Sequence, residues 1–288
     1  PANIFLCFGR KTQTLKPSRM ATPSIFLTDN GSLRPEATFQ LRRLAGQLSA
    51  RCGHRVEAVS LLHSHKIPSE ALDGRPATIV KRRIRELARE GQRAFVILPL
   101  FLGPSLAITD YLPKLVEELR QEIPGLTVSV AEPIAGRSVQ EPDVRLAAML
   151  RDQVCRLGAI EAPDQVALVD HGTPIPVVNE LRNAVARQLA NELGRPVQAC
   201  SMERREGPEY AFNDPLLEKL EPPQAAGLGR LHLAMFFLLP GRHAGPGGDV
   251  AQIAESLVAH GAFSKVMISP LLSEHPALPD ILSDRLQA

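Results

Sequence analysis

The sequence contains no tryptophan, and aromatic residues make up only 4% of its 288 residues. We therefore expect no extended stacking surface for single-stranded nucleic acid. The formal net charge is only +2, from 33 basic and 31 acidic residues. A nearly neutral chain lacks the overall basic field that is typical of nucleic-acid binders. These two shortages predict that nucleic acid is not a partner.

Long hydrophobic runs are also missing. No apolar run approaches the about 20 residues that a helix needs to cross a bilayer, so we expect no membrane partner. The four cysteines lie far apart and form no CxxC pair: Cys7, Cys52, Cys155 and Cys200. This spacing excludes the common zinc-ribbon and iron–sulfur motifs and favours reduced thiols in a cytoplasmic protein.

The first residues place a short apolar patch before a basic stretch, which is the reverse of the order in a signal peptide. We interpret residues 1–19 as an N-terminal extension and Met20 as a candidate natural start. After this extension the sequence repeats itself. The phrase "FLTDNG" recurs as "ALVDHG", and further pairs follow at an offset near 140 residues. Because chance does not hold one register through several segments, we infer an internal duplication.

The duplication aligns three polar residues of the second copy with different residues of the first. The aligned pairs are Asn30 with His171, Leu62 with Glu203, and Ser105 with His243. The join between the copies is expected in the polar stretch 158–165. This predicts a first domain at 20–157, which lacks the histidines, and a second domain at 158–288, which carries them.

Each copy alternates short β-branched apolar runs with amphipathic helical patterns. Strands are predicted at 24–28, 56–62, 94–102, 126–131, 166–170, 197–202, 231–239 and 265–271, and helices at 36–50, 111–123, 178–193 and 250–261. Such alternation is typical of a parallel sheet covered by helices on both faces. The expected fold class is therefore α/β, with two such domains that face each other across a cleft.

Three candidate ligands follow strands of the second copy. His171 comes after 166–170, Glu203 after 197–202, and His243 after 231–239. Ligands of open parallel sheets bind at the carboxyl ends of the strands, so the three side chains should meet at one edge. Two imidazoles and a carboxylate suit a divalent first-row metal. The alternative is that each histidine only caps a turn and that Glu203 pairs with a neighbouring arginine.

Basic residues and glycines flank these ligands. Arg204, Arg205 and Arg242 could pair with carboxylates of a substrate, and Gly245 could let the chain approach a flat ring. The alternatives are a solvated charged edge and an ordinary loop. His63 and His65 could form a second metal site, but the sequence offers no third ligand nearby, which favours surface or turn positions.

The stretches "VDHGTPIPVVNELRNAVARQL", "CSMERREGPEY" and "MFFLLPGRHAGPGGDVAQI" resemble the class II chelatases of the CbiX type, which insert cobalt or iron into sirohydrochlorin. The resemblance implies two flavodoxin-like chelatase domains with a macrocycle bound between them. It implies Co²⁺ or Fe²⁺ as a substrate, with no organic cofactor and no ATP. His171 would be the principal base and metal ligand, and Glu203 and His243 would be co-ligands.

The sequence departs from that family in two places. Thr173, Pro174 and Ile175 stand where the family has a Ser-Arg-Asp run, and the connection 204–227 is longer than usual and could form a flap. The first copy would have lost its metal site and become a wall of the cleft. Both walls could then come from one chain, which allows a monomer as well as a homodimer.

Three functional hypotheses remain open from the sequence. The first is a sirohydrochlorin metal chelatase. The second is a non-catalytic carrier of metal or tetrapyrrole on the same fold. The third is a relative of the protoporphyrin ferrochelatases, which the low aromatic content and the basic residues near the site disfavour, because they suit a highly carboxylated ring better than an apolar one.

Overall fold

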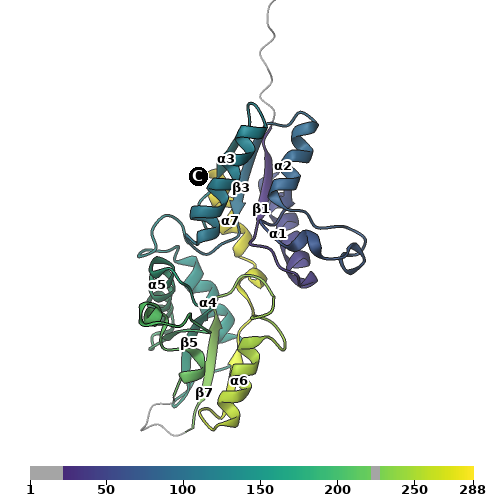
Figure 1. Ribbon diagram of the computed structural model, residues 1–288. Coiled ribbons are helices and arrows are strands. Elements are labelled where there is room, and N and C mark those ends of the chain that lie inside the picture. The colour runs from purple at the N-terminus through teal and green to yellow at the C-terminus, as the bar shows by residue number, and fades with distance from the viewer. Residues whose placement is uncertain (1–21, 222–227) are drawn as a thin grey trace, which may run out of the picture.

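The computed structural model describes residues 22–221 and 228–288, so the predicted extension 1–19 lies outside the described residues. The chain forms two lobes, each built around a four-stranded parallel sheet (Figure 1). The predicted α/β class and the two-domain organisation are confirmed. No helix among the described residues is long and apolar enough to cross a membrane.

The first lobe has its strands in the order β2-β1-β3-β4. Its elements along the chain are β1 (Ser24–Thr28), α1 (Pro35–Cys52), β2 (Val56–Ala58), the short helices η1 (Ser64–Lys66) and η2 (Ser69–Leu72), α2 (Val80–Arg89), β3 (Ala94–Pro99), the π-helical turn η3 (Ala107–Tyr111), α3 (Leu112–Glu122) and β4 (Thr127–Val130). The predicted strand 56–62 is shorter in the structure, where β2 ends at Ala58. Beyond it the Val59 and Leu61 amides still donate to the Leu27 and Asp29 carbonyls, while Ser60 turns to an isolated bridge with Ile79.

The second lobe repeats this arrangement in the order β6-β5-β7-β8. Its elements are β5 (Gln165–Asp170), α5 (Pro176–Leu193), β6 (Gln198–Ser201), η4 (Pro208–Asn213), η5 (Leu217–Lys219), β7 (Arg230–Met235), α6 (Asp249–Ala259), β8 (Lys265–Ile268) and η6 (Leu272–Glu274). Two further helices, α4 (Arg145–Cys155) and α7 (Leu278–Gln287), follow the fourth strands of the first and second sheets.

Equivalent backbone contacts confirm the duplication. The Leu62 amide donates to the Asn30 carbonyl over 3.0 Å, and the Glu203 amide donates to the His171 carbonyl over 3.2 Å. A glycine with positive φ follows each turn residue, at Gly31 and Gly172. A Cβ on Gly172 would lie 1.9 Å from the Glu203 carbonyl oxygen, so a side chain cannot be accommodated there. The turn geometry therefore depends on this close approach.

The lobes exchange their last helices. Helix α4 packs against α5 and β7 of the second lobe, whereas α7 packs against α1 and β3 of the first. Figure 1 shows α7, in yellow, beside α1 in the upper lobe, and α4 beside α5 in the lower one. The bounds 20–157 and 158–288 therefore stay a prediction for the two repeats, because each packed lobe contains a helix from the other one.

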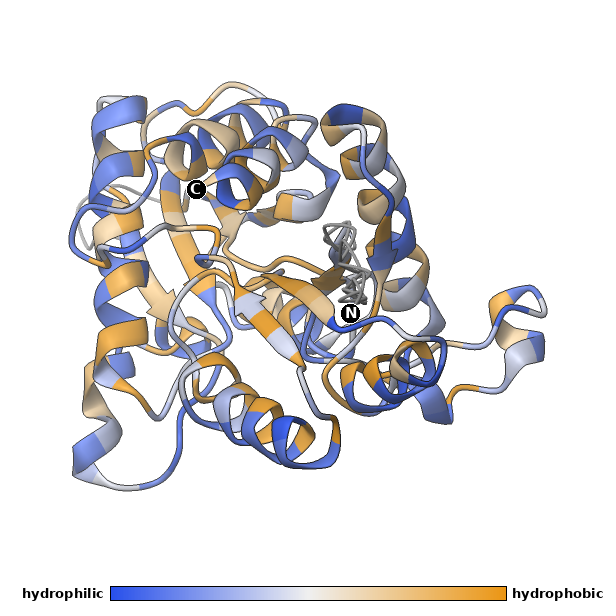
Figure 2. Cartoon of the chain, turned by 90° about the horizontal axis from the view of Figure 1, so that it is seen from above, coloured by the Kyte–Doolittle hydropathy of each residue, from blue (hydrophilic) through white to orange (hydrophobic). Residues whose placement is uncertain are grey.

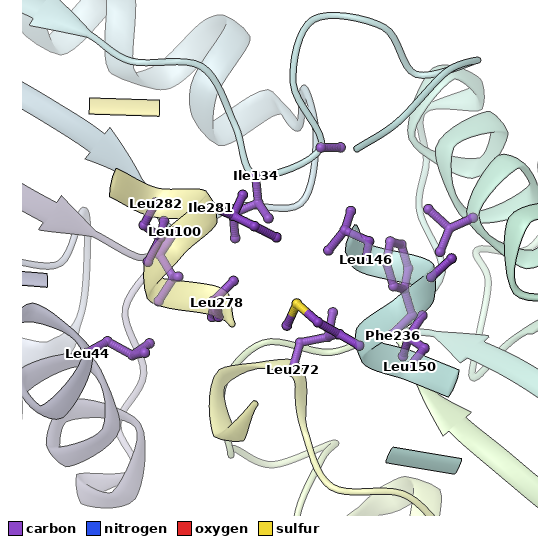
Figure 3. Packing of buried hydrophobic residues seen from close by; sticks show 14 of the residues in the cluster. Leu44, Leu100, Ile134, Leu146, Leu150, Phe236, Leu272, Leu278, Ile281 and Leu282 are labelled. Carbon is purple, nitrogen blue, oxygen red and sulfur yellow. The ribbon is translucent and has the colours of Figure 1, made fainter. Parts of the chain in front are cut away.

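A single apolar cluster joins the lobes across this exchange (Figure 3). Leu278, Ile281 and Leu282 on α7 are fully buried, as are Leu146 and Leu150 on α4. Burying one such side chain stabilises a fold by about 1.5–3 kcal/mol, so the exchange couples the two lobes strongly. Outside this core the helices turn hydrophilic sides outward, while the strands between them are mostly hydrophobic (Figure 2).

Candidate metal centre

The predicted ligands all lie beyond the carboxyl ends of strands in the second sheet. His171 follows β5, Glu203 follows β6 by two residues, and His243 lies in the loop between β7 and α6. Strand β5 is flanked by β6 and β7, which places His171 between the other two. In Figure 1, β7 runs toward the junction of the lobes, so these loops lie at the end of the second lobe that faces the first.

The three side chains come together as the sequence predicts. The imidazole rings of His171 and His243 have centroids 4.4 Å apart and meet edge to face at 81°. The His171 Nε2 atom lies 3.5 Å from Glu203 Oε1. Exposed fractions are 46% for the His171 side chain, 58% for Glu203 and 31% for His243, so all three can reach a ligand from solvent.

The cluster is not a finished coordination shell. Within residues 22–221 and 228–288, no three His, Cys, Asp or Glu side chains are placed to hold a metal ion as they stand. Binding would require rotations of exposed side chains, which are small changes for groups at strand ends. An open, adjustable site of this kind suits an ion that is taken up and passed on, in contrast to the closed shell of a structural metal.

Hydrogen bonds orient both imidazoles in the same sense. His243 Nδ1 lies 2.7 Å from Asp249 Oδ2, at the start of α6. His171 Nδ1 lies 3.2 Å from the Gly172 carbonyl oxygen. Both partners are acceptors, so the tautomer with the proton on Nδ1 satisfies these two contacts and leaves Nε2 as the metal-binding nitrogen.

A buried polar network supports the turn that carries His171. The Asp170 carboxylate accepts hydrogen bonds from the Ser201 hydroxyl at 2.6 Å and from the Gly172 amide at 3.1 Å. Arg182, which is 1% exposed, donates to Ser201 Oγ at 3.0 Å and has its Nη1 atom 3.8 Å from the Asp170 carboxylate. Burial raises the pKa of Asp170, and Arg182 opposes that shift with its positive charge.

The connection after Glu203 ties back to the same turn. Asn213 accepts a hydrogen bond from the Thr173 amide at 3.0 Å and donates to the Thr173 carbonyl at 2.9 Å. The part of the predicted flap that the structure describes, 204–221, therefore forms short helices anchored beside the site. Residues 222–227 lie outside the described residues.

The predicted substrate-binding residues differ in their surroundings. Arg204 pairs with Asp214 at 2.9 Å within its own connection, and the Arg205 guanidinium lies 5.9 Å from the centroid of the Tyr210 ring. The Arg242 side chain is 78% exposed, with its Nε atom 3.8 Å from Asp249 Oδ2. Gly245 has a φ of 125° and lines an inter-lobe groove of about 290 Å³ between the 240–248 loop and the start of α1. Arg205, Arg242 and Gly245 thus remain accessible, whereas Arg204 is already engaged.

His63 and His65 lie at η1 in the first lobe. His63 has a positive φ of 62°, and His65 Nδ1 is buried without a hydrogen-bond partner in the part of the chain that the structure describes. They belong to no metal-holding group among the described residues. Their turn position agrees with the simpler of the two predictions.

Asp249 and Arg182 are functional candidates that sequence reasoning missed. Asp249 stands six residues after His243 at a helix start, where an acidic residue is expected for the helix dipole alone. Arg182 lies within an amphipathic helical pattern, where arginine usually faces solvent. The spacing from Asp249 to His243 is a usable signal in hindsight, while Arg182 offers none.

Comparisons with known proteins add independent findings. The CbiX family model matches residues 24–155. The solved structure of SirB from Bacillus subtilis with Fe3+ matches with a TM-score of 0.66 at 16% identity, covering 92% of this chain and 94% of that one. SirB from Bacillus subtilis subspecies spizizenii in complex with cobalt matches with a TM-score of 0.66 at 14% identity, covering 92% of this chain and 94% of that one.

A third structure is that of CbiX, described as the terminal enzyme for biosynthesis of siroheme in denitrifying bacteria. It matches with a TM-score of 0.54 at 12% identity, covering 92% of this chain and 98% of that one. No curated protein matches the chain in sequence. The structural matches establish a shared two-lobed fold, and the family model falls on the repeat that lacks the candidate ligands.

Proposed function

We propose that the protein is a class II chelatase that inserts a divalent metal into a carboxylated tetrapyrrole of the sirohydrochlorin type. The match of residues 24–155 to the CbiX family model supports this proposal. The observation that carries this proposal is the convergence of His171, Glu203 and His243 beyond the carboxyl ends of strands in the second lobe. Both imidazoles have Nδ1 beside an acceptor, which leaves Nε2 as the nitrogen for the metal, and the third group is a carboxylate.

The chemistry of insertion suits this set. One M²⁺ replaces two pyrrole protons, so the site must hold a metal weakly and accept protons close to the ring nitrogens. A neutral imidazole can do either, because its ordinary pKa of about 6.5 lies close to neutral pH. We assign His171 as principal base and ligand because it lies between the other two, with His243 and Glu203 as co-ligands. Cobalt and iron both fit such a donor set.

The surroundings suit an anionic macrocycle. Arg205 and Arg242 stand near the ligands, and the groove beside Gly245 is also lined by Arg34 of the first lobe. Guanidinium groups recognise carboxylates through paired hydrogen bonds. The first lobe offers Asn30, Leu62 and Ser105 at the positions equivalent to the ligands, so it contributes a wall of the cleft without a second metal site.

The carrier hypothesis is the second candidate, and one observation favours it. The family model matches the repeat without the ligands, while the repeat that carries them departs from the family run after His171. A carrier would bind one equivalent of metal or tetrapyrrole and stop.

Turnover separates the two hypotheses. Sirohydrochlorin in tenfold excess over protein, mixed with Co²⁺ or Fe²⁺, should convert fully to metallated product, followed by its visible spectrum and corrected for the rate without protein. Conversion that stops at one equivalent would support the carrier and contradict the chelatase. The same assay with protoporphyrin should show no conversion above background.

Replacing Asp249 with asparagine should weaken Co²⁺ binding by about tenfold. The change keeps a hydrogen-bond acceptor for His243 Nδ1 but removes the charge that fixes its orientation, and loss of such a partner typically costs 10- to 100-fold in metal affinity. Binding is measured by titration calorimetry. Asp280→Asn is the matched control, because it removes a first-turn carboxylate of α7 that pairs with Arg51 at 2.7 Å and not with a candidate ligand. Equal Co²⁺ affinities in the two variants would contradict the role assigned to Asp249.

A further inference from the structure

The first lobe contains a cavity of about 410 Å³ between α1, β2 and the segment 75–78, separate from the proposed metal centre. Several residues that line this cavity align with residues at and around Arg182 in the second lobe. Helices α1 and α5 both begin at a proline and are followed by a left-handed glycine at Gly53 and Gly194, which fixes their alignment. The matching residues are Thr38 with Asn179, Leu41 with Arg182, and Ser60 with Ser201.

The two lobes treat this space differently. In the second lobe Arg182 occupies it, bonded to Ser201 and facing Asp170. In the first lobe Leu41 stands in place of the arginine, and no basic side chain of the described residues pairs with the buried Asp29. Asp29 Oδ1 has no hydrogen-bond partner in the described residues, and burial raises the pKa of this carboxyl group. The second lobe thus has the Arg182 guanidinium at this position, whereas the first lobe has the shorter Leu41 beside an open cavity.

Three arginines surround the open space: Arg42, Arg55 and Arg75. Within the described parts of the chain, none of them lies within 4.0 Å of a carboxylate. Arg42 donates only to backbone carbonyls, those of Leu72 at 3.5 Å and Arg75 at 2.5 Å. The guanidinium charges are thus not neutralised by direct ion pairs.

The acidic groups near the cavity do not neutralise the positive charge of these three arginines. Glu57 lines the cavity, but its carboxylate pairs with Arg83 at 2.6 Å. Asp73 raises the pKa of Arg42, while burial and the positive charge of Arg75 lower it more. Like charges held together in a partly desolvated pocket oppose folding, and an anion between them would relieve this repulsion.

Hydroxyl groups complete the lining. Thr38 and Ser60 are 7% and 4% exposed, and Thr78 stands at the cavity wall. Guanidinium and hydroxyl donors together are the usual partners of carboxylate and phosphate oxygens. From the cavity, its three unpaired arginines and the contrast with Arg182, we infer that the first lobe binds a compact multivalent oxyanion, either a polycarboxylate or a phosphorylated small molecule.

The test is calorimetric titration of the full chain with citrate and with pyrophosphate, without metal or tetrapyrrole and at matched ionic strength. At least one of the two anions should bind, and which one binds identifies the carboxylate or the phosphate class. Arg42→Gln and Arg75→Gln should each weaken that binding by about tenfold, since a hydrogen bond to a charged group contributes about 1.5–3 kcal/mol. Leu41→Arg, which recreates the filled arrangement of the second lobe, should abolish it.

Arg89→Gln is the matched control, because this exposed arginine ends α2 and does not line the cavity. It should bind the anion within twofold of the parent protein, as should His171→Ala, which separates this site from the proposed chelatase. Absence of binding by both anions, or unchanged affinity in Arg42→Gln and Arg75→Gln, would overturn the inference.

Discussion

His171→Ala should lower metal insertion by at least about 100-fold. The side chain is proposed to hold the ion and to accept a pyrrole proton, and loss of a positioned base alone typically costs 10²- to 10⁴-fold. Its neighbour Glu203, 3.5 Å away, can take over part of the metal binding but cannot restore the central position between β6 and β7. The measurement is initial insertion rate with sirohydrochlorin and Co²⁺ or Fe²⁺ at saturating concentrations.

Asn30→Ala is the control that the duplication itself supplies. Asn30 holds the same place in the first lobe, with an equivalent backbone contact to the following strand, so the two changes perturb equivalent turns. It should keep the insertion rate within about twofold. Both variants should keep the parent melting temperature, because each residue is exposed at a strand end and lies outside the core. A His171→Ala protein with full activity would remove the central assignment.

The positions of the strands can be predicted from the sequence, because buried parallel strands have a strong local signal. The four short runs in each copy were found, with boundaries wrong by a few residues where apolar loops continue the strand pattern, as after Pro99 and Met235. The candidate ligands were found by a different route. The duplication marks His171 and His243 as residues that one copy has and the other lacks.

The helix exchange could not be predicted in this way. The sequence pattern of a helix shows that it has an apolar side but does not show which sheet that side covers. Helices α4 and α7 were not predicted at all, although their buried leucines join the two lobes. The open cavity beside Arg42 could not be predicted from the sequence either, because it depends on how the side chains around Leu41 pack.

Arg182→Leu should destabilise the protein by about 3 kcal/mol at neutral pH. The variant leaves Asp170 buried without its cation, and removal of one partner from a buried pair typically costs 3–5 kcal/mol. The Ser201 and Gly172 donors that remain keep the expected loss at the lower end of that range. The free energy of unfolding is measured by urea denaturation followed by circular dichroism. The His171 turn rests on the same carboxylate, so metal affinity should fall as well.

The dependence on pH distinguishes a lost ion pair from lost packing. Without Arg182 the pKa of Asp170 in the folded protein rises further, so the folded state holds its proton more tightly than the unfolded chain does. The stability deficit should therefore shrink as the pH falls from 8 to 5, and it should be greatest above the folded pKa. The first lobe shows that such a carboxyl group can be accommodated, because Asp29 is buried there with Leu41 at the position equivalent to Arg182.

The double change Asp170→Asn with Arg182→Leu completes the argument. It replaces the buried charge with a neutral group of the same shape, which can still accept from Ser201 and Gly172. The double variant should regain most of the stability lost by Arg182→Leu and should lose the dependence on pH. If both variants are equally unstable at every pH, the loss of stability comes from the packing of the long arginine side chain. The ion pair between Arg182 and Asp170 would then not be its cause.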